Sequence, residues 1–134
     1  MLTVLAEREL TAYDFMRCLF ATLAKNKRSI INKSAIVKVI YDFQEAMLRE
    51  NNHDVISMFD DIEFRKGIDE NVVSYDINEV INNLQTFGVV GKLNPTYDKL
   101  FIYLTEQEAD EILSQYNQEV QDTMSLLAGC FAGE

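Results

Sequence analysis

Few residues of this chain have the type and spacing that catalysis needs. The single histidine, His53, stands beside Asp54, but no nucleophile follows at a spacing known from hydrolases. Three acids, Asp60, Asp61 and Glu63, could gather a divalent cation, yet they lack the glycine and the ligand spacing of a calcium-binding loop. No glycine-rich phosphate loop, GxSxG or CxxC motif occurs. We therefore predict a protein that is not an enzyme and holds no metal or cofactor.

Composition is that of an ordinary folded domain. The 134 residues are 48% hydrophobic and 25% charged, which suits one domain with a real core over residues 1–134. No apolar run approaches the ~20 residues of a membrane span, and the first residues lack the basic start of a signal peptide. Cys18 and Cys130 form no metal or redox spacing and lie among apolar residues. We expect a cytoplasmic protein with no membrane partner.

Charge is distributed unevenly along a chain whose formal net charge is −10. Residues 1–50 hold eight Lys or Arg against six Asp or Glu, a balance of +2, so residues 51–134 carry −12. One stretch without any acid contains five cations and is a candidate nucleic-acid contact: Lys25, Lys27, Arg28, Lys33 and Lys38. The alternative is a solvated basic loop that pairs with acids of its own or a neighbouring chain.

The N-terminal half, residues 1–52, is predicted to be helical. Thr11 is a good N-cap, and the apolar residues behind it recur at helical spacing over residues 12–25. A polar, basic connection follows. Ser34 is a candidate N-cap for a second helix, which we expect to end near residues 51–52, where two asparagines tolerate the left-handed conformation.

The C-terminal part, residues 74–128, is predicted to run helix, hairpin, helix. Asp76 and Glu79 are spaced as a capping box, and Gly88 stands where a helix commonly ends in a left-handed glycine. Between the two parts, residues 53–73 indicate little more than a short helix, for which Asp54 is a candidate cap.

Two apolar, β-prone stretches, VVGKL and KLFIYL, flank the turn-forming segment NPTYD and predict a hairpin. Thr105 and Glu108 then form a second capping box. An apolar stripe continues behind it as one long helix to about residue 128. The expected fold class is therefore mainly α with a small β-hairpin and a long C-terminal helix.

The order of these pieces resembles a known family. The segments INNLQTFGVV, GKL, NPTYDKLFIYL and LTEQEADEIL are similar to the helix, wing and capped helix of winged-helix regulators of the multidrug-resistance and PadR type. The resemblance covers about residues 76–115 and implies a winged-helix-like domain. It implies a recognition-helix face formed by Asn78, Asn82, Asn83 and Gln85, and a wing with Lys92 and Lys99.

The apolar residues near the end of the chain suggest that two copies of the protein associate. Apolar residues continue late in the predicted last helix, where a helix rising ~1.5 Å per residue outruns so small a domain. C-terminal helices of dimeric relatives of this fold point the same way. We therefore predict a homodimer with its seam at Val120, Met124, Leu127 and Phe131.

Charge decides between the candidate functions. The predicted recognition helix has amides that can read adenine but no cation, and acids crowd the following helix. The favoured hypothesis is a non-catalytic regulatory or adaptor protein that binds a protein partner. The alternative is a dimeric DNA-binding regulator that uses the basic residues 25–38. A minor alternative is an acidic mimic of DNA.

Overall fold

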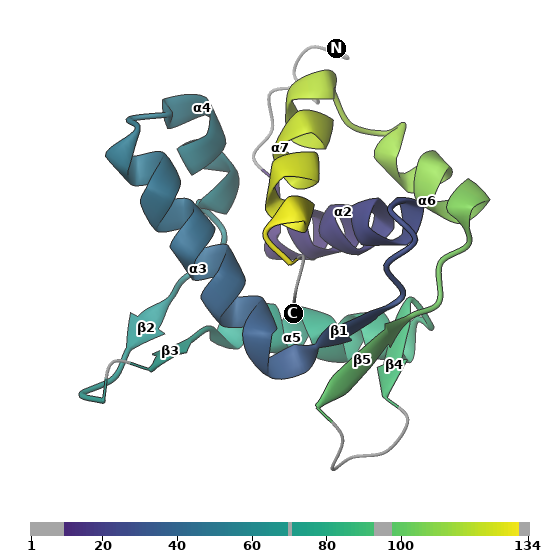
Figure 1. Cartoon of the computed structure of the whole chain (residues 1–134), viewed down its shortest axis with the longest axis horizontal. Helices are drawn as coiled ribbons and strands as arrows, with labels where there is room; N and C mark the ends of the chain where they lie inside the picture. The colour runs from purple at the N-terminus through teal and green to yellow at the C-terminus, as the bar shows by residue number, and fades with distance from the viewer. Residues whose placement is uncertain (1–9, 70, 93–97, 132–134) are drawn as a thin grey trace.

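Helices form most of the structure, with a three-stranded antiparallel sheet and a separate two-stranded one (Figure 1). The computed structural model describes residues 10–69, 71–92 and 98–131. In chain order its elements are α2 (Ala12–Lys25), β1 (Ile30–Asn32), α3 (Lys33–Arg49), α4 (His53–Ile56), the 3₁₀ helix η1 (Ser57–Phe59), β2 (Arg65–Lys66), β3 (Val72–Val73), α5 (Tyr75–Thr86), β4 (Val90–Lys92), β5 (Lys99–Ile102), α6 (Glu106–Leu113) and α7 (Gln118–Gly129). The predicted fold class, mainly α with a small β part, is confirmed.

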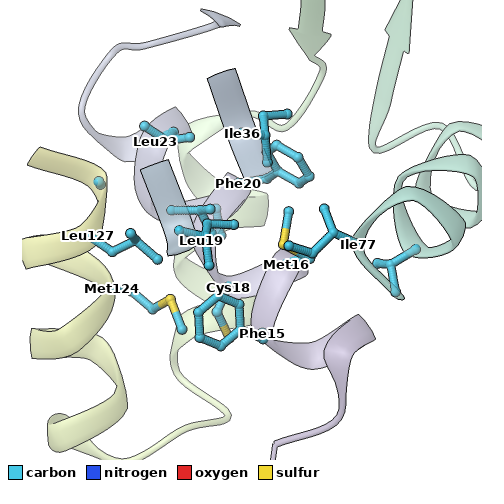
Figure 2. Packing of buried hydrophobic residues seen from close by; sticks show 14 of the residues in the cluster. Phe15, Met16, Cys18, Leu19, Phe20, Leu23, Ile36, Ile77, Met124 and Leu127 are labelled. Carbon is cyan, nitrogen blue, oxygen red and sulfur yellow. The ribbon is translucent and has the colours of Figure 1, made fainter. Parts of the chain in front are cut away.

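Helix α2 is the centre of the core. It starts as predicted, because the Thr11 side chain accepts a hydrogen bond from the backbone N–H of Asp14 at 3.1 Å. Its side chains are buried on most of its circumference, and it contacts α5, α6 and α7. Figure 2 shows Phe15, Met16 and Phe20 of this helix inside the cluster of buried side chains. A helix that is apolar nearly all round belongs in the interior of a domain.

The three-stranded sheet has the order β1–β5–β4, and all its pairs are antiparallel. Its inner face is apolar and buried: Ile31 pairs with Leu100, and Val90 pairs with Ile102. Strand β1 corrects the prediction of a polar connection between the first two helices. The two isoleucines of this segment are too few to predict a strand from the sequence. The segment becomes a strand because it pairs with β5, some 70 residues away in the chain.

The order helix, strand, helix, helix and hairpin agrees with the winged-helix expectation, but that assignment stays a prediction. Between α3 and α5 the chain inserts residues 53–73, which form α4, η1 and the β2–β3 hairpin. Asn52 caps α4 by accepting from the N–H of Val55, so Asp54 is not the cap. Phe59 anchors the insertion in the core, with its ring 5.0 Å from that of Phe15.

Two further predicted helix starts are wrong. Ser34 lies inside α3, which begins at Lys33, and its backbone N–H donates instead to the carboxylate of Asp98 at 2.9 Å. Helix α5 is capped by Ser74, whose hydroxyl accepts from the N–H of Ile77, so no capping box forms from Asp76. In both places another polar residue of the right type stands close by, and local spacing alone does not choose between them.

The end of α5 is confirmed in detail. Gly88 has a φ of +77°, the left-handed conformation expected of a glycine just past a helix. Its N–H donates to the carbonyl of Gln85 at 3.2 Å, and the N–H of Val89 donates to the carbonyl of Leu84 at 2.9 Å. These two bonds form a Schellman motif, which directs the chain from α5 straight into β4.

The prediction of one long C-terminal helix is wrong. The Thr105–Glu108 capping box is present, but α6 ends at Leu113 and a separate helix, α7, begins at Gln118. Asn117 caps α7 by accepting from the N–H of Val120 at 2.9 Å. Residues 114–117 turn the chain, so that α7 folds back over α2 instead of extending beyond the domain (Figure 1).

This turn also overturns the predicted dimer seam. Its four residues are buried inside one chain, with exposed fractions of 8% for Val120 and 0% for Met124, Leu127 and Phe131. In Figure 2, Met124 and Leu127 point toward the side chains of α2. The apolar stripe continues because α7 needs a buried face of its own, so it supplies core instead of a surface for a second chain.

Candidate macromolecular interface

Helix α5 presents one face to the core and the other to solvent. Ile77, Val80, Ile81 and Leu84 are buried, as the helical spacing predicted. The opposite face contains Asn78, Asn82 and Asn83, all exposed, while Gln85 is half-buried. Their exposure follows from the sequence, but their role in binding stays a prediction.

Aromatic side chains stand at both ends of this exposed face. Tyr75, at the first position of α5, is 71% exposed, and Phe87, just past its end, is 70% exposed. The guanidinium of Arg65 lies 5.8 Å from the centre of the Tyr75 ring, and its Nε is 3.5 Å from the carboxylate of Glu63. The face therefore combines two exposed rings with amides and the exposed carboxylate of Glu79, and α5 itself contains no Lys or Arg.

Most of the basic stretch that the sequence singled out is already paired. Lys25 contacts Asp110 at 2.8 Å, and Lys27 contacts Glu106 at 3.0 Å, which ties the end of α2 to α6. Both pairs are exposed, where an ion pair contributes at most about 1 kcal/mol to stability. Their carboxylates nevertheless stand where a phosphate would have to approach.

The other three cations of the stretch are divided between two places. Lys38 pairs with Asp42 one helical turn away at 2.8 Å. Arg28 and Lys33 lie near the sheet, where the Nε of Arg28 donates to the carbonyl of Ile30 at 3.5 Å. The five cations therefore do not form one surface.

Both predicted wing lysines belong to the sheet itself, Lys92 at the end of β4 and Lys99 at the start of β5. Partial burial, and then the ammonium of Lys92 beside it, lower the pKa of Lys33, while the charge of Asp98 opposes that shift. Lys99 donates to the side-chain oxygen of Asn32 at 2.6 Å. The tip between the two wing strands, residues 93–97, lies outside the described residues.

A polar network fastens the turn before α7 to α2. The Tyr116 hydroxyl donates to Asp14 at 2.9 Å and accepts from Arg17 at 3.0 Å. Burial raises the pKa of the Tyr116 hydroxyl, and burial likewise raises the pKa of the Cys18 thiol to about 12, against the opposing charge of Arg17. A thiol held neutral in the core is unreactive, so this network is structural and offers no nucleophile.

The candidate catalytic and metal-binding residues are not gathered into a site. His53 is exposed at the start of α4, and Asp61 accepts a hydrogen bond from the backbone N–H of Ala12 at the start of α2. Within residues 10–69, 71–92 and 98–131, no group of three or more His, Cys, Asp or Glu side chains is placed to hold a metal ion.

One surface was missed by the sequence interpretation. On β5 and just beyond it, Lys99, Phe101 and Tyr103 alternate with two buried residues and therefore share the outer face of the sheet. The stretch KLFIYL contained this signal as a strict period of two. The same period that predicts a strand also indicates that Lys99, Phe101 and Tyr103 face outward.

Comparisons with known proteins add no assignment. No protein-family model matches the chain, and no curated protein or solved structure matches it either. No helix in the described part of the chain is long and apolar enough to cross a membrane.

Proposed function

We propose that this chain is a non-catalytic regulatory or adaptor protein that binds a protein partner through the exposed face of α5. The observation that carries the proposal is the pair of exposed rings, Tyr75 and Phe87, at the two ends of a helix face that holds three exposed asparagines and one carboxylate, Glu79. Aromatic anchors supply most of the energy in many protein interfaces. The amides between them add hydrogen bonds at a lower desolvation cost than charges would, and Glu79 gives the face one negative charge for a donor or cation of the partner.

The state of the cysteines supports a cytoplasmic location for this activity. Cys18 and Cys130 are both free thiols, and Cys18 is buried in the core. Free thiols are typical of reducing compartments, whereas small secreted domains commonly rely on disulfides. The proposal does not depend on a homodimer, which would have to use a surface other than the buried residues of α7.

A site-specific cross-link tests the proposal. A photo-reactive amino acid replaces Asn82, in the middle of the α5 face, and in a matched chain it replaces Glu119, which is exposed on α7. In cells of the source organism we expect one defined protein adduct from position 82 and none of that mass from position 119. The combined change Tyr75→Ala and Phe87→Ala should remove the adduct without lowering the melting temperature. Equal adducts from both positions, or an adduct that survives this change, would contradict the proposal.

The alternative is a DNA-binding regulator, and the strand order of the sheet favours it. A wing beside α5 suits a duplex, and Lys33 and Lys92 are available beside that wing. A gel shift with random duplex at ~50 mM salt is the test, because phosphate contacts weaken steeply as salt rises. A shift that is lost at ~200 mM salt and in the Lys33→Glu, Lys92→Glu variant would favour this alternative over the protein partner.

The DNA-mimic alternative has less support. A mimic needs an array of carboxylates free to meet a basic channel. On α6, Glu106 and Asp110 pair with lysines of α2, and Glu108 accepts from the backbone N–H of Thr105 in the capping box. The acids of α6 therefore already serve the fold, as a charged helix face usually does.

A further inference from the structure

The asparagines and the glutamate on the outward side of α5 bond to nothing in the described part of the chain. Other surface helices carry a pair of side chains one turn apart: Lys38 with Asp42 on α3, Gln107 with Glu111 on α6, and Gln118 with Asp122 on α7. On α5, by contrast, four exposed side chains pair with no described residue: Asn78, Glu79, Asn82 and Asn83. Their polar groups are therefore available to a second molecule.

Asparagine is also a poor residue for the middle of an exposed helix. Its short side chain competes with the helix for backbone hydrogen bonds, whereas Lys, Glu or Gln would form the helix more readily. Helix α5 nevertheless has three asparagines among its 12 residues and no Lys or Arg. A local choice that weakens the helix and adds no contact within the chain indicates that these residues serve binding.

One row along α5 is formed by Tyr75, Glu79, Asn82 and Thr86. These residues recur at steps of four, three and four, the spacing that places side chains on the same face of a helix. With a rise of about 1.5 Å per residue, Glu79 lies about 6 Å beyond Tyr75 and about 12 Å before Phe87, which follows the row. The row therefore holds an unpaired carboxylate between two exposed rings.

The charge beside this row is negative as well. Glu63 and Asp76 stand with Glu79 near the start of α5 against one cation, Arg65, so three acids and one base leave a balance of −2. The guanidinium of Arg65 already lies between the ring of Tyr75 and the carboxylate of Glu63. It is therefore not free for an acidic partner. The formal net charge of −10 attracts a basic partner over a longer range.

We propose that this row, defined by Tyr75, Glu79, Asn82 and Phe87, binds a basic segment of the partner protein. An arginine or lysine of that segment contacts the carboxylate of Glu79, and apolar side chains on both sides of the cation cover the two rings. The asparagine amides donate to and accept from the main chain of the segment. An acidic segment or a nucleic acid would instead meet a carboxylate and no free cation on this helix.

The inference rests on the proposed function of α5 and adds the chemistry of its partner. A cation on Glu79 forms a charge-assisted hydrogen bond, which gains strength where neighbouring contacts exclude water. The two rings supply those contacts. An extended segment advances about 3.3 Å per residue, so apolar residues two before and four after the cation reach Tyr75 and Phe87.

A titration followed by ¹⁵N–¹H correlation spectra tests this on the intact chain. The probe is the peptide acetyl-Leu-Ser-Arg-Ser-Thr-Ser-Leu-amide, and its control has Glu in place of Arg. We expect saturable shift changes in the backbone amides of residues 75–87, and binding of the control peptide weaker by roughly fivefold or more. Glu79→Gln should weaken the arginine peptide roughly threefold or more. The matched change Glu119→Gln on α7 removes the same charge and should alter binding by less than about 1.5-fold.

Three results of the titration would overturn the inference. These are shift changes that lie on α6 and α7 instead of α5, equal binding of the two peptides, and equal losses in Glu79→Gln and Glu119→Gln. Melting curves check that each variant is folded.

The cross-link from position 82 separates this inference from the proposed function. When Glu79→Lys is added to that chain, we expect the adduct to be lost because the partner's cation is repelled. An adduct that persists would leave the protein partner of α5 in place and overturn only its basic chemistry. If the chain with the original Glu79 gives no adduct, the proposed function fails, and this inference fails with it.

Discussion

Gly88 is the residue whose backbone conformation the end of α5 needs. Its φ of +77° is strained for any residue with a Cβ, yet nothing lies within 4 Å of the place a Cβ would take. We therefore expect Gly88→Ala to lower the free energy of unfolding by roughly 1 kcal/mol through backbone strain alone. Urea denaturation followed by circular dichroism measures the change.

Gly129 provides the matched control for that substitution. It is the last residue of α7, and a Cβ there also meets nothing within 4 Å. Because alanine is the better helix former, Gly129→Ala should leave the free energy of unfolding unchanged or raise it by up to about 1 kcal/mol. An equal loss in both variants would show that the left-handed backbone is not the cause.

Cys18 makes the stability of the protein sensitive to alkaline pH. Burial raises the pKa of its thiol to about 12 in the folded chain, from an ordinary value of 9.0. Above pH 9 the unfolded chain therefore loses this proton first, and unfolding becomes easier as the pH rises toward 12. We expect the free energy of unfolding to fall by roughly 1–2 kcal/mol between pH 8.5 and about pH 10.5 from this thiol.

The comparison that isolates this effect uses the pH dependence instead of the absolute stability. Cys18→Ala should lower the free energy of unfolding at every pH. Between pH 8.5 and about pH 10.5, however, the free energy of unfolding of this variant should fall by less than that of the original chain. Cys130→Ala should change the slope less than Cys18→Ala does, since partial burial raises the pKa of the Cys130 thiol by a smaller amount. The pKa of Tyr116 is also raised, so this residue contributes to the fall in stability at alkaline pH in all three chains. Identical slopes for Cys18→Ala and the original chain would rule the thiol out.

At the scale of elements, α7 decides whether the C-terminal stripe is core or seam. Two neighbouring leucines separate the possibilities, because Leu127 is fully buried while Leu126 is 63% exposed. Leu127→Ala should lower the free energy of unfolding by about 2–5 kcal/mol, whereas Leu126→Ala should change it by less than about 0.5 kcal/mol. Urea denaturation at two protein concentrations measures both variants.

Protein concentration distinguishes a core from an interface between chains. If α7 packs within one chain, the loss in Leu127→Ala is the same at low and high protein concentration. If the loss of stability in Leu127→Ala grows on dilution, these residues form an interface between two chains. For the same reason, removing the chain after Tyr116 should unfold the domain and expose α2, instead of releasing a folded monomer.

The whole molecule has an excess of negative charge that must repel itself. The formal net charge is −10, while the described ion pairs are exposed and individually weak. Salt should screen the repulsion more than it weakens the pairs. We expect the stability at pH 7 to rise by about 1 kcal/mol, or roughly 3–5 °C in the melting temperature, between about 10 and about 200 mM NaCl.

The sequence pI supplies the control for this effect. Near pH 4.5, where the net charge approaches zero, the same addition of salt should leave the melting temperature almost unchanged. Differential scanning fluorimetry measures both series. A melting temperature that falls with salt at pH 7 would mean that the ion pairs between α2 and α6 outweigh the repulsion.

The sequence by itself determined the features that depend on a few neighbouring residues. The Thr11 cap, the glycine stop at Gly88 and the Thr105 capping box all depend on residues within one helical turn, and all three are present. The buried and exposed faces of α5 followed from the 3.6-residue period in the same way. Local spacing chose the wrong cap where two candidates competed, as at Ser74 and Asp76.

Tertiary structure alone decided what depends on residues far apart in the chain. Strand β1 exists because Ile30 pairs with Phe101, and the turn at residues 114–117 is held by Tyr116 reaching back to α2. The same folding pairs Lys25 with Asp110 and buries the stripe of α7. A period in the sequence shows which side chains share a face, but not which surface that face will meet. The candidate sites changed accordingly, because a charge or an apolar stripe becomes available for binding only if the fold leaves it unpaired.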